Sequence, residues 1–156
     1  MKEGLLNQID SIEEFFNRSS RCLTEADSNF APKDGMMTVA QQVAHSAQCI
    51  EWFTNALTNP QGFDLDFEGH WKEVKACTSL EEARKWFSKA IVAAKTTVSA
   101  MTEAEIMSPL PQGPVMGGAP KIVVIGAMSE HTAHHRGALT VYSRLLGHVP
   151  KMPYME

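Results

Sequence analysis

Hydrophobic residues recur three or four positions apart through four long segments of the chain. This spacing places them on one face of an α-helix. The pattern predicts helices over residues of about 5–26, 38–57, 79–101 and 120–146. No segment combines alternating apolar and polar residues with flanking turn signals, so we predict an all-α fold in which these helices pack as a bundle. In the first segment the apolar face consists of Leu5, Ile9, Ile12, Phe16 and Leu23.

Capping residues support several of these boundaries. Thr38 is a suitable N-cap for the second helix. Ser79 precedes Glu82 by three residues, which is the spacing of a reciprocal capping box at the start of the third. Gly147 suits a left-handed stop after the fourth. We also expect a short helical turn near residues 71–76, within the long connection between the second and third helices.

Composition narrows the class of protein. A chain of 156 residues suits a single domain, which we place at residues 1–156. The net charge is −4 and the Lys and Arg residues are scattered, which argues against nucleic-acid binding. No apolar run is long enough to span a bilayer, and the N-terminus lacks the apolar core of a signal peptide. Three cysteines without Cys-x-x-Cys spacing indicate free thiols in a reducing cytoplasm.

The residues best suited to chemistry lie in the fourth predicted helix. His131 and His135 are four residues apart, so their imidazoles stand one turn apart on one helical face and can reach one metal ion. Buried neutral imidazoles are unfavourable unless their nitrogens have partners, and a metal ion provides such a partner. His134 is rotated off this face, and we do not expect it to be a ligand.

A third ligand has to come from another helix. His45 is the only other histidine within a predicted long helix, where it lies at the edge of the apolar face. Three histidines leave at least one coordination position open, which is typical of a catalytic site. The alternative is a pair of histidines that only form hydrogen bonds in the core. The run around His131 matches neither protease pattern, His-Glu-x-x-His or His-x-x-Glu-His.

Other residues near the histidines have several interpretations. Cys49 follows His45 by one helical turn, and we predict a buried free thiol because a cysteine ligand would close the site. Trp52 is a candidate for the wall of a pocket. His70 and Trp71 lie in a long connection, where binding residues are common. None of these observations identifies a general base, so the catalytic residues stay unassigned.

The run His131–Leu139 (HTAHHRGAL) resembles the signature of the DinB family, within the DinB/YfiT-like metalloproteins. Members carry His-x-x-x-His followed by Arg-Gly, then by a Tyr, an Arg and a Gly. They also carry a histidine in the second helix, which His45 matches. The resemblance covers essentially the whole chain, and one departure is Ala138, where many relatives have Gln. The later matching residues are Tyr142, Arg144 and Gly147.

This resemblance implies an up-down-down-up four-helix bundle, frequently as a homodimer. It implies one divalent metal ion on His45, His131 and His135, with zinc or nickel as the first candidates and iron or manganese as further ones. The better-understood relatives transfer low-molecular-weight thiols such as bacillithiol. We therefore expect a metal-dependent thiol S-transferase with a small-molecule substrate. A metal-dependent hydrolase and a non-catalytic, metal-stabilised interaction module are the alternatives.

Overall fold

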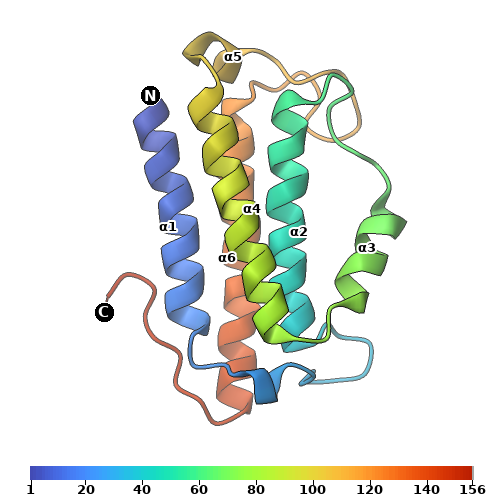
Figure 1. Ribbon diagram of the computed structural model, residues 1–156, viewed down its shortest axis with the longest axis vertical. Helices are drawn as coiled ribbons and strands as arrows, with labels where there is room; N and C mark the ends of the chain where they lie inside the picture. Colours follow the sequence, from blue (N-terminus) through green and yellow to red (C-terminus); the bar gives the residue numbers. More distant parts are fainter. Residues whose placement is uncertain (156) are drawn as a thin grey trace.

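The computed structural model of the protein describes residues 1–155 and is all-helical, which confirms the predicted fold class. Four long helices lie side by side, with two short helices and a 3-10 turn between them (Figure 1). Within the described range, the only β pairing is an isolated bridge between Pro109 and Pro120. The elements are α1 (Lys2–Ser20), η1 (Glu25–Asp27), α2 (Val39–Thr58), α3 (Phe67–Ala76), α4 (Leu80–Ala100), α5 (Glu103–Met107) and α6 (Ile122–Leu145).

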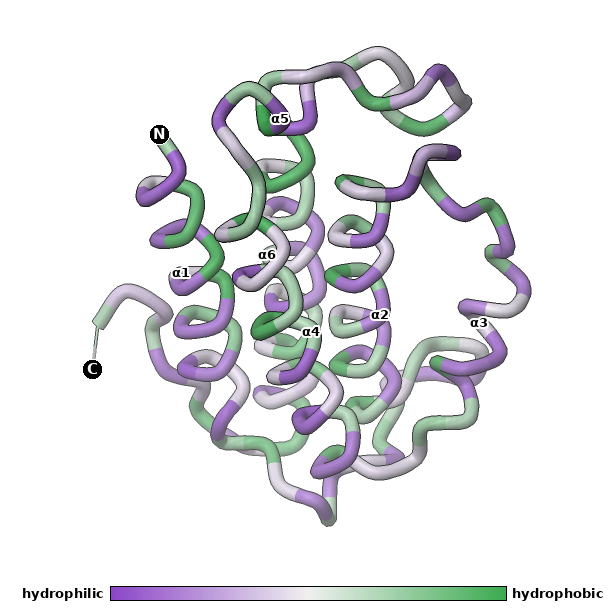
Figure 2. Tube along the Cα trace, turned by 45° about the horizontal axis from the view of Figure 1, so that its top comes forward, coloured by the Kyte–Doolittle hydropathy of each residue, from purple (hydrophilic) through white to green (hydrophobic). Residues whose placement is uncertain are grey.

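Each long helix packs against two others. The helices α1 and α2 both contact α4 and α6, whereas α3 packs mainly against the outside of α2. Green and purple segments alternate along each long helix in Figure 2, as expected where one face is apolar and the other polar. In the core, the rings of Phe16 and Phe87 stack with their centroids 4.4 Å apart. None of the described helices is apolar over a length that could cross a bilayer.

The first helix is shorter than predicted. It ends at Ser20, not near residue 26, although Leu23 is buried as its place in the apolar pattern suggested. The carboxylate of Asp27 accepts hydrogen bonds from the backbone N–H and the hydroxyl of Thr24. Side chains that bond to nearby backbone compete with helix continuation, so a separate turn, η1, forms here.

The caps of the other helices follow the prediction with one difference. Thr38 begins α2 with a reciprocal box to Gln41, and Gly147 has a φ of +82° just after α6. Ser79 accepts a hydrogen bond from the backbone N–H of Glu82, but the return bond is missing among the described contacts. The Glu82 carboxylate instead pairs with Lys85 at 2.7 Å, so the predicted capping box is only half formed.

The predicted short turn near residues 71–76 is a helix of ten residues, α3. It begins earlier than expected because the carboxylate of Asp66 accepts a hydrogen bond from the backbone N–H of Gly69. Within α3, the side chain of Val74 is fully buried, while those of Phe67 and Trp71 stay partly exposed beside α2. The helix therefore forms one wall of the space next to the histidines.

Candidate metal centre

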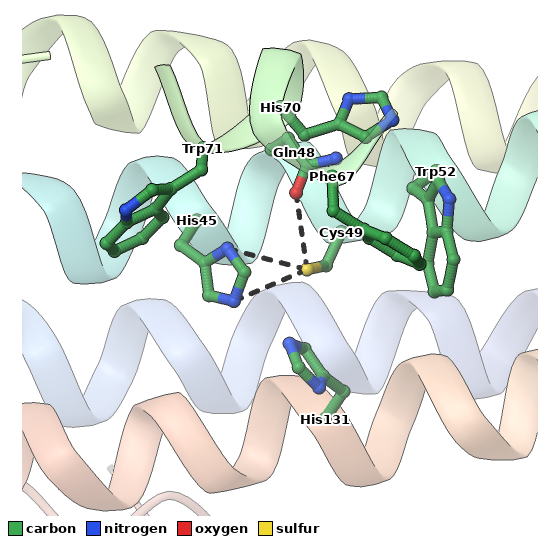
Figure 3. Close-up of a pocket in the computed structure, with 8 residues that line it drawn as sticks. All are labelled: His45, Gln48, Cys49, Trp52, Phe67, His70, Trp71 and His131. Atoms are coloured by element: carbon green, nitrogen blue, oxygen red, sulfur yellow. Dashed lines mark hydrogen bonds between the residues drawn. The ribbon is translucent and has the colours of Figure 1, made fainter. Parts of the chain in front are cut away.

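The three histidines singled out from the sequence meet between α2 and α6. His45 extends from α2, and His131 and His135 extend from adjacent turns of α6. One ring nitrogen from each lies within 4.8 Å of the other two. Figure 3 shows His131 pointing from α6 toward His45 on α2. The contact between these two helices thus brings together side chains about 90 residues apart in the sequence.

The spacing of the nitrogens suits a shared ion. The Nε2 atoms of His131 and His135 are 3.1 Å apart. Two nitrogens bound to one zinc ion at about 2.0–2.1 Å would lie roughly 3.3 Å apart at a tetrahedral angle. His45 approaches from the opposite helix, with its ring centroid 4.7 Å from that of His135. The three donors therefore fit a single divalent cation with an open position.

A buried hydrogen-bond network orients His135. The hydroxyl of Tyr142 donates to the carbonyl of Met37 at 3.1 Å and accepts from the amide nitrogen of Gln42 at 3.3 Å. This arrangement directs the Gln42 Oε1 atom toward His135, where it lies 2.7 Å from Nδ1. Because that oxygen can only accept, Nδ1 carries the proton and the Nε2 lone pair faces His131.

Gln42 is a site residue that the sequence analysis did not identify. It lies three residues before His45 in a helix whose apolar face was assigned to the core. Its side chain is only 6% exposed, and it is 93 residues from its partner His135 in the sequence. The sequence offered one signal for Gln42, which is that a glutamine stands on the buried face of a predicted helix. A buried amide requires hydrogen-bond partners, so such a position indicates a polar contact.

Burial keeps the three imidazoles neutral. It is the main cause that lowers the pKa of His45 to about 4 and of His135 to about 3, and neighbouring histidines add smaller effects in the same direction. The pKa of His131 is also lowered, first by burial and then by His134. Neutral imidazole is the form that binds metal ions, so the cluster is ready for a ligand role at neutral pH.

A cavity of about 280 Å³ opens beside the histidines, between α2 and α3. Aromatic rings make up much of its wall, and the indole N–H of Trp52 donates to the carbonyl of Asp64 at 2.7 Å, which fixes that ring. Trp71 approaches His45 edge to face at 6.1 Å. The lining residues, shown in Figure 3, are His45, Gln48, Cys49, Trp52, Phe67, His70, Trp71 and His131.

Cys49 is a buried free thiol, as predicted. Its Sγ atom lies 3.6 Å from Nε2 of His45 and donates to Oε1 of Gln48 at 3.5 Å. Burial raises the pKa of this thiol to about 12, so it stays protonated at neutral pH. Cys49 therefore belongs to the cavity wall and lacks the properties of a nucleophile.

Three other residues of α6 lie near the cluster but are not part of it, although the ring centroids of His134 and His135 are only 5.0 Å apart. His134 is exposed, consistent with its place off the inward face, and it is not part of the group that could hold an ion. Glu130 is also exposed. The guanidinium of Arg136 lies over the ring of Phe15 on α1, 5.8 Å from its centroid. Arg136 thus packs between α6 and α1 instead of facing the histidines.

Comparison with known families agrees with the resemblance seen in the sequence. The model of the DinB family matches residues 5–156, nearly the full length of the chain. The chain has no significant match among curated proteins.

Proposed function

The chain belongs to the DinB family, and from this premise we propose that it binds one divalent metal ion with His45, His131 and His135. We propose further that it is an S-transferase that joins a small, bacillithiol-type thiol to an electrophile. The observation that carries the proposal is the group of three neutral imidazoles within 4.8 Å of one another at the edge of a cavity. Zinc and nickel are the first candidate metals, followed by iron and manganese.

The residues present have separate roles in this proposal. A divalent cation held by the three neutral imidazoles would retain its charge and would favour the thiolate form of a nearby thiol. Gln42 holds His135 with its Nε2 lone pair toward the ion. Trp52 and Trp71 would give the thiol an apolar wall beside the histidines. In the reaction, sulfur forms a bond to carbon, the leaving group departs with its electron pair, and the thiol proton passes to solvent.

The cavity supports thiol transfer over the alternatives. Hydrolysis would benefit from a carboxylate that removes a proton from water, and no Asp or Glu lines this cavity in the described part of the chain. A metal that only stabilised the bundle would not need an open space of about 280 Å³ beside its ligands. Both observations favour an enzyme that accepts a small apolar molecule.

The proposal includes the helix arrangement and the assembly. Followed from their N-termini, α1 and α6 run downward in Figure 1 and α2 and α4 run upward, which supports an up-down-down-up bundle. The family match over residues 5–156 supports one domain. A homodimer and a cytoplasmic location remain predictions from the family resemblance and the composition.

The first test is metal content, measured by elemental mass spectrometry on untagged protein purified without added metal. We expect about one ion per chain in the parent and none in a His131→Ala/His135→Ala variant. The loaded protein should then form thioether from a small thiol and an aromatic electrophile. A chelator should abolish this activity, and added metal should restore it.

Two results would replace the proposal. Ester hydrolysis without thioether formation would identify a hydrolase. A parent that takes up no zinc, nickel, iron or manganese would assign the histidines a structural role.

A further inference from the structure

A cavity separate from the one beside the histidines lies between α1, α6 and the chain that follows α6. Its volume is about 460 Å³, within the usual range of small-molecule pockets. After α6 the chain turns back beside α1 (Figure 1), where the Arg18 guanidinium donates to the carbonyl of Pro153 at 2.6 Å. The rings of Phe15 and Tyr154 meet edge to face at 5.0 Å. These two contacts hold the C-terminal segment in place as one wall of the cavity.

A row of α6 residues away from the histidine face forms another wall. Arg136 follows His135 directly, so it is turned by about 100° around the helix axis. Arg136, Thr140 and Arg144 are spaced four residues apart, lie along one side of α6 and line the cavity. The two arginines that match the family signature, which the metal site does not use, therefore border a second space.

The charged side chains in the described lining of this cavity are all positive. Lys151 from the C-terminal segment joins Arg136 and Arg144, and no Asp or Glu is among these lining residues. None of the three cations forms an ion pair with a carboxylate within residues 1–155. Arg144 donates one N–H group to the carbonyl of Thr140 at 2.9 Å, which leaves other donors of its guanidinium for a ligand. In a protein of net charge −4, the cavity is a local excess of positive charge.

Ser19 on α1 points to a ligand independently of the charges. It lines the cavity, its side chain is only 1% exposed, and its hydroxyl has no hydrogen-bond partner in the described part of the chain. Ser11, Ser46 and Ser143, which also lie in long helices, each donate to the carbonyl four residues earlier. Ser19 makes no such bond. A buried hydroxyl without a partner is unfavourable, so an acceptor oxygen bound in the cavity would stabilise it.

We propose that this cavity binds the phosphate group of a small molecule. The guanidinium groups of Arg136 and Arg144 match pairs of phosphate oxygens, Lys151 adds a third positive charge, and the Ser19 hydroxyl donates from the inner wall. A phosphate group has more charge and more acceptor oxygens than a carboxylate, so it fits four donors better. The inference does not rest on metal binding or thiol transfer, because this cavity shares no lining residue with the one beside the histidines.

The test measures binding of phenyl phosphate, inorganic phosphate and phenol by calorimetry at low ionic strength. Both phosphates should bind and phenol should not. The Arg144→Gln/Lys151→Gln variant changes two exposed side chains, so it should fold normally and raise the Kd of phenyl phosphate by about tenfold or more. The Lys72→Gln/Lys89→Gln variant removes two exposed charges outside the cavity and should stay within about twofold of the parent.

The Ser19→Ala variant tests the hydroxyl with two readouts of opposite sign. Removing a buried hydroxyl that has no partner should leave the free protein at least as stable in urea titrations. The same change should weaken binding of phenyl phosphate by about threefold or more, because the bound phosphate loses a donor. A residue that only packs against its neighbours would not combine these effects, and an unchanged Kd would overturn the role of Ser19.

The two sources of a phosphate group give different results. Tighter binding of phenyl phosphate than of inorganic phosphate would support an organic phosphate as the ligand, and equal affinities would support free phosphate. Binding of neither would overturn the inference. An equal loss of affinity in the Lys72→Gln/Lys89→Gln variant would also overturn it, because the effect would then come from overall charge.

The His131→Ala/His135→Ala variant separates this inference from the proposed function. It should bind phenyl phosphate with the Kd of the parent although it holds no metal. Loss of phosphate binding in this variant would place the phosphate at the metal and overturn the inference. Phosphate binding in a protein that forms no thioether would retain the second site and reject thiol transfer.

Discussion

The Oε1 atom of Gln42 on α2 lies 2.7 Å from Nδ1 of His135 on α6. The Tyr142 hydroxyl fixes the orientation of this amide from its other side, because it accepts a hydrogen bond of 3.3 Å from the Nε2 atom of Gln42. Gln42 therefore holds the His135 ring from its Nδ1 side. It cannot itself bind the ion, because the Nε2 atom on the opposite side of the ring is the one that faces the other histidines. Metal affinity should depend on this pair as well as on the three histidines.

Replacing Gln42 with Leu should lower metal affinity by about 10–100-fold. The variant leaves the Nδ1–H group of His135 without its acceptor and lets the ring rotate. A competition titration with a chelating dye measures the affinity. In the metal-free protein, nitrogen-15 NMR should show the Nδ1–H tautomer of His135 in the parent and a mixture in the variant. Gln8→Leu on α1 is the matched control, and an unchanged tautomer in Gln42→Leu would refute the role.

Single alanine variants of the histidines should separate ligands from neighbours. His45→Ala, His131→Ala and His135→Ala should each lose most of the bound metal and keep a helical circular-dichroism spectrum. His134→Ala should retain about one ion per chain, since its side chain is exposed and outside the group. Elemental mass spectrometry provides the measurement. If His134→Ala loses as much metal as the others, the assignment of three ligands is wrong.

The metal-free protein should lose stability as the pH falls below about 6.5. Burial lowers the folded-state pKa of His45 to about 4 from an ordinary value of 6.5, so between these values the unfolded chain binds a proton that the native state does not. The free energy of unfolding should decrease as the pH drops through this window and level off, for this group, below about pH 4. Urea titrations at several pH values measure it.

The His45→Gln variant provides the control for this pH dependence. It removes one of the buried imidazoles, so its stability should fall less steeply over the same pH window. The contribution of His135, whose pKa is lowered to about 3, should remain in the variant. Identical slopes in parent and variant would show that His45 does not titrate differently in the folded and unfolded chains.

The aromatic stack in the core should be a major source of stability. Phe87→Ala removes a ring that is 1% exposed and stacks on Phe16, so we expect a loss of about 3–5 kcal/mol. Urea unfolding followed by circular dichroism measures the change. Phe15→Ala removes a half-buried ring that contacts Tyr154 in the tail, and its effect should be clearly smaller. Equal losses would contradict the placement of the core at Phe16 and Phe87.

Local patterns predicted the helical elements well, for a physical reason. Helical spacing of apolar residues and the capping chemistry of Thr38 depend only on neighbours in the sequence. The same reasoning failed at the end of α1, because Leu23 continues the apolar period while Thr24 and Asp27 form a competing turn. Leu23 is buried although α1 has already ended, because the chain that follows the helix still places this side chain against the core.

The sequence by itself determined that the chain is helical, that His131 and His135 share one face, and that His45 was the candidate partner. Only the tertiary structure decided that these side chains meet, that Gln42 orients one of them, and that α3 encloses a cavity beside them. These features depend on how far each helix is rotated and shifted against its neighbour when side chains interlock. Such packing arises from the whole bundle, so no local pattern in the chain records it.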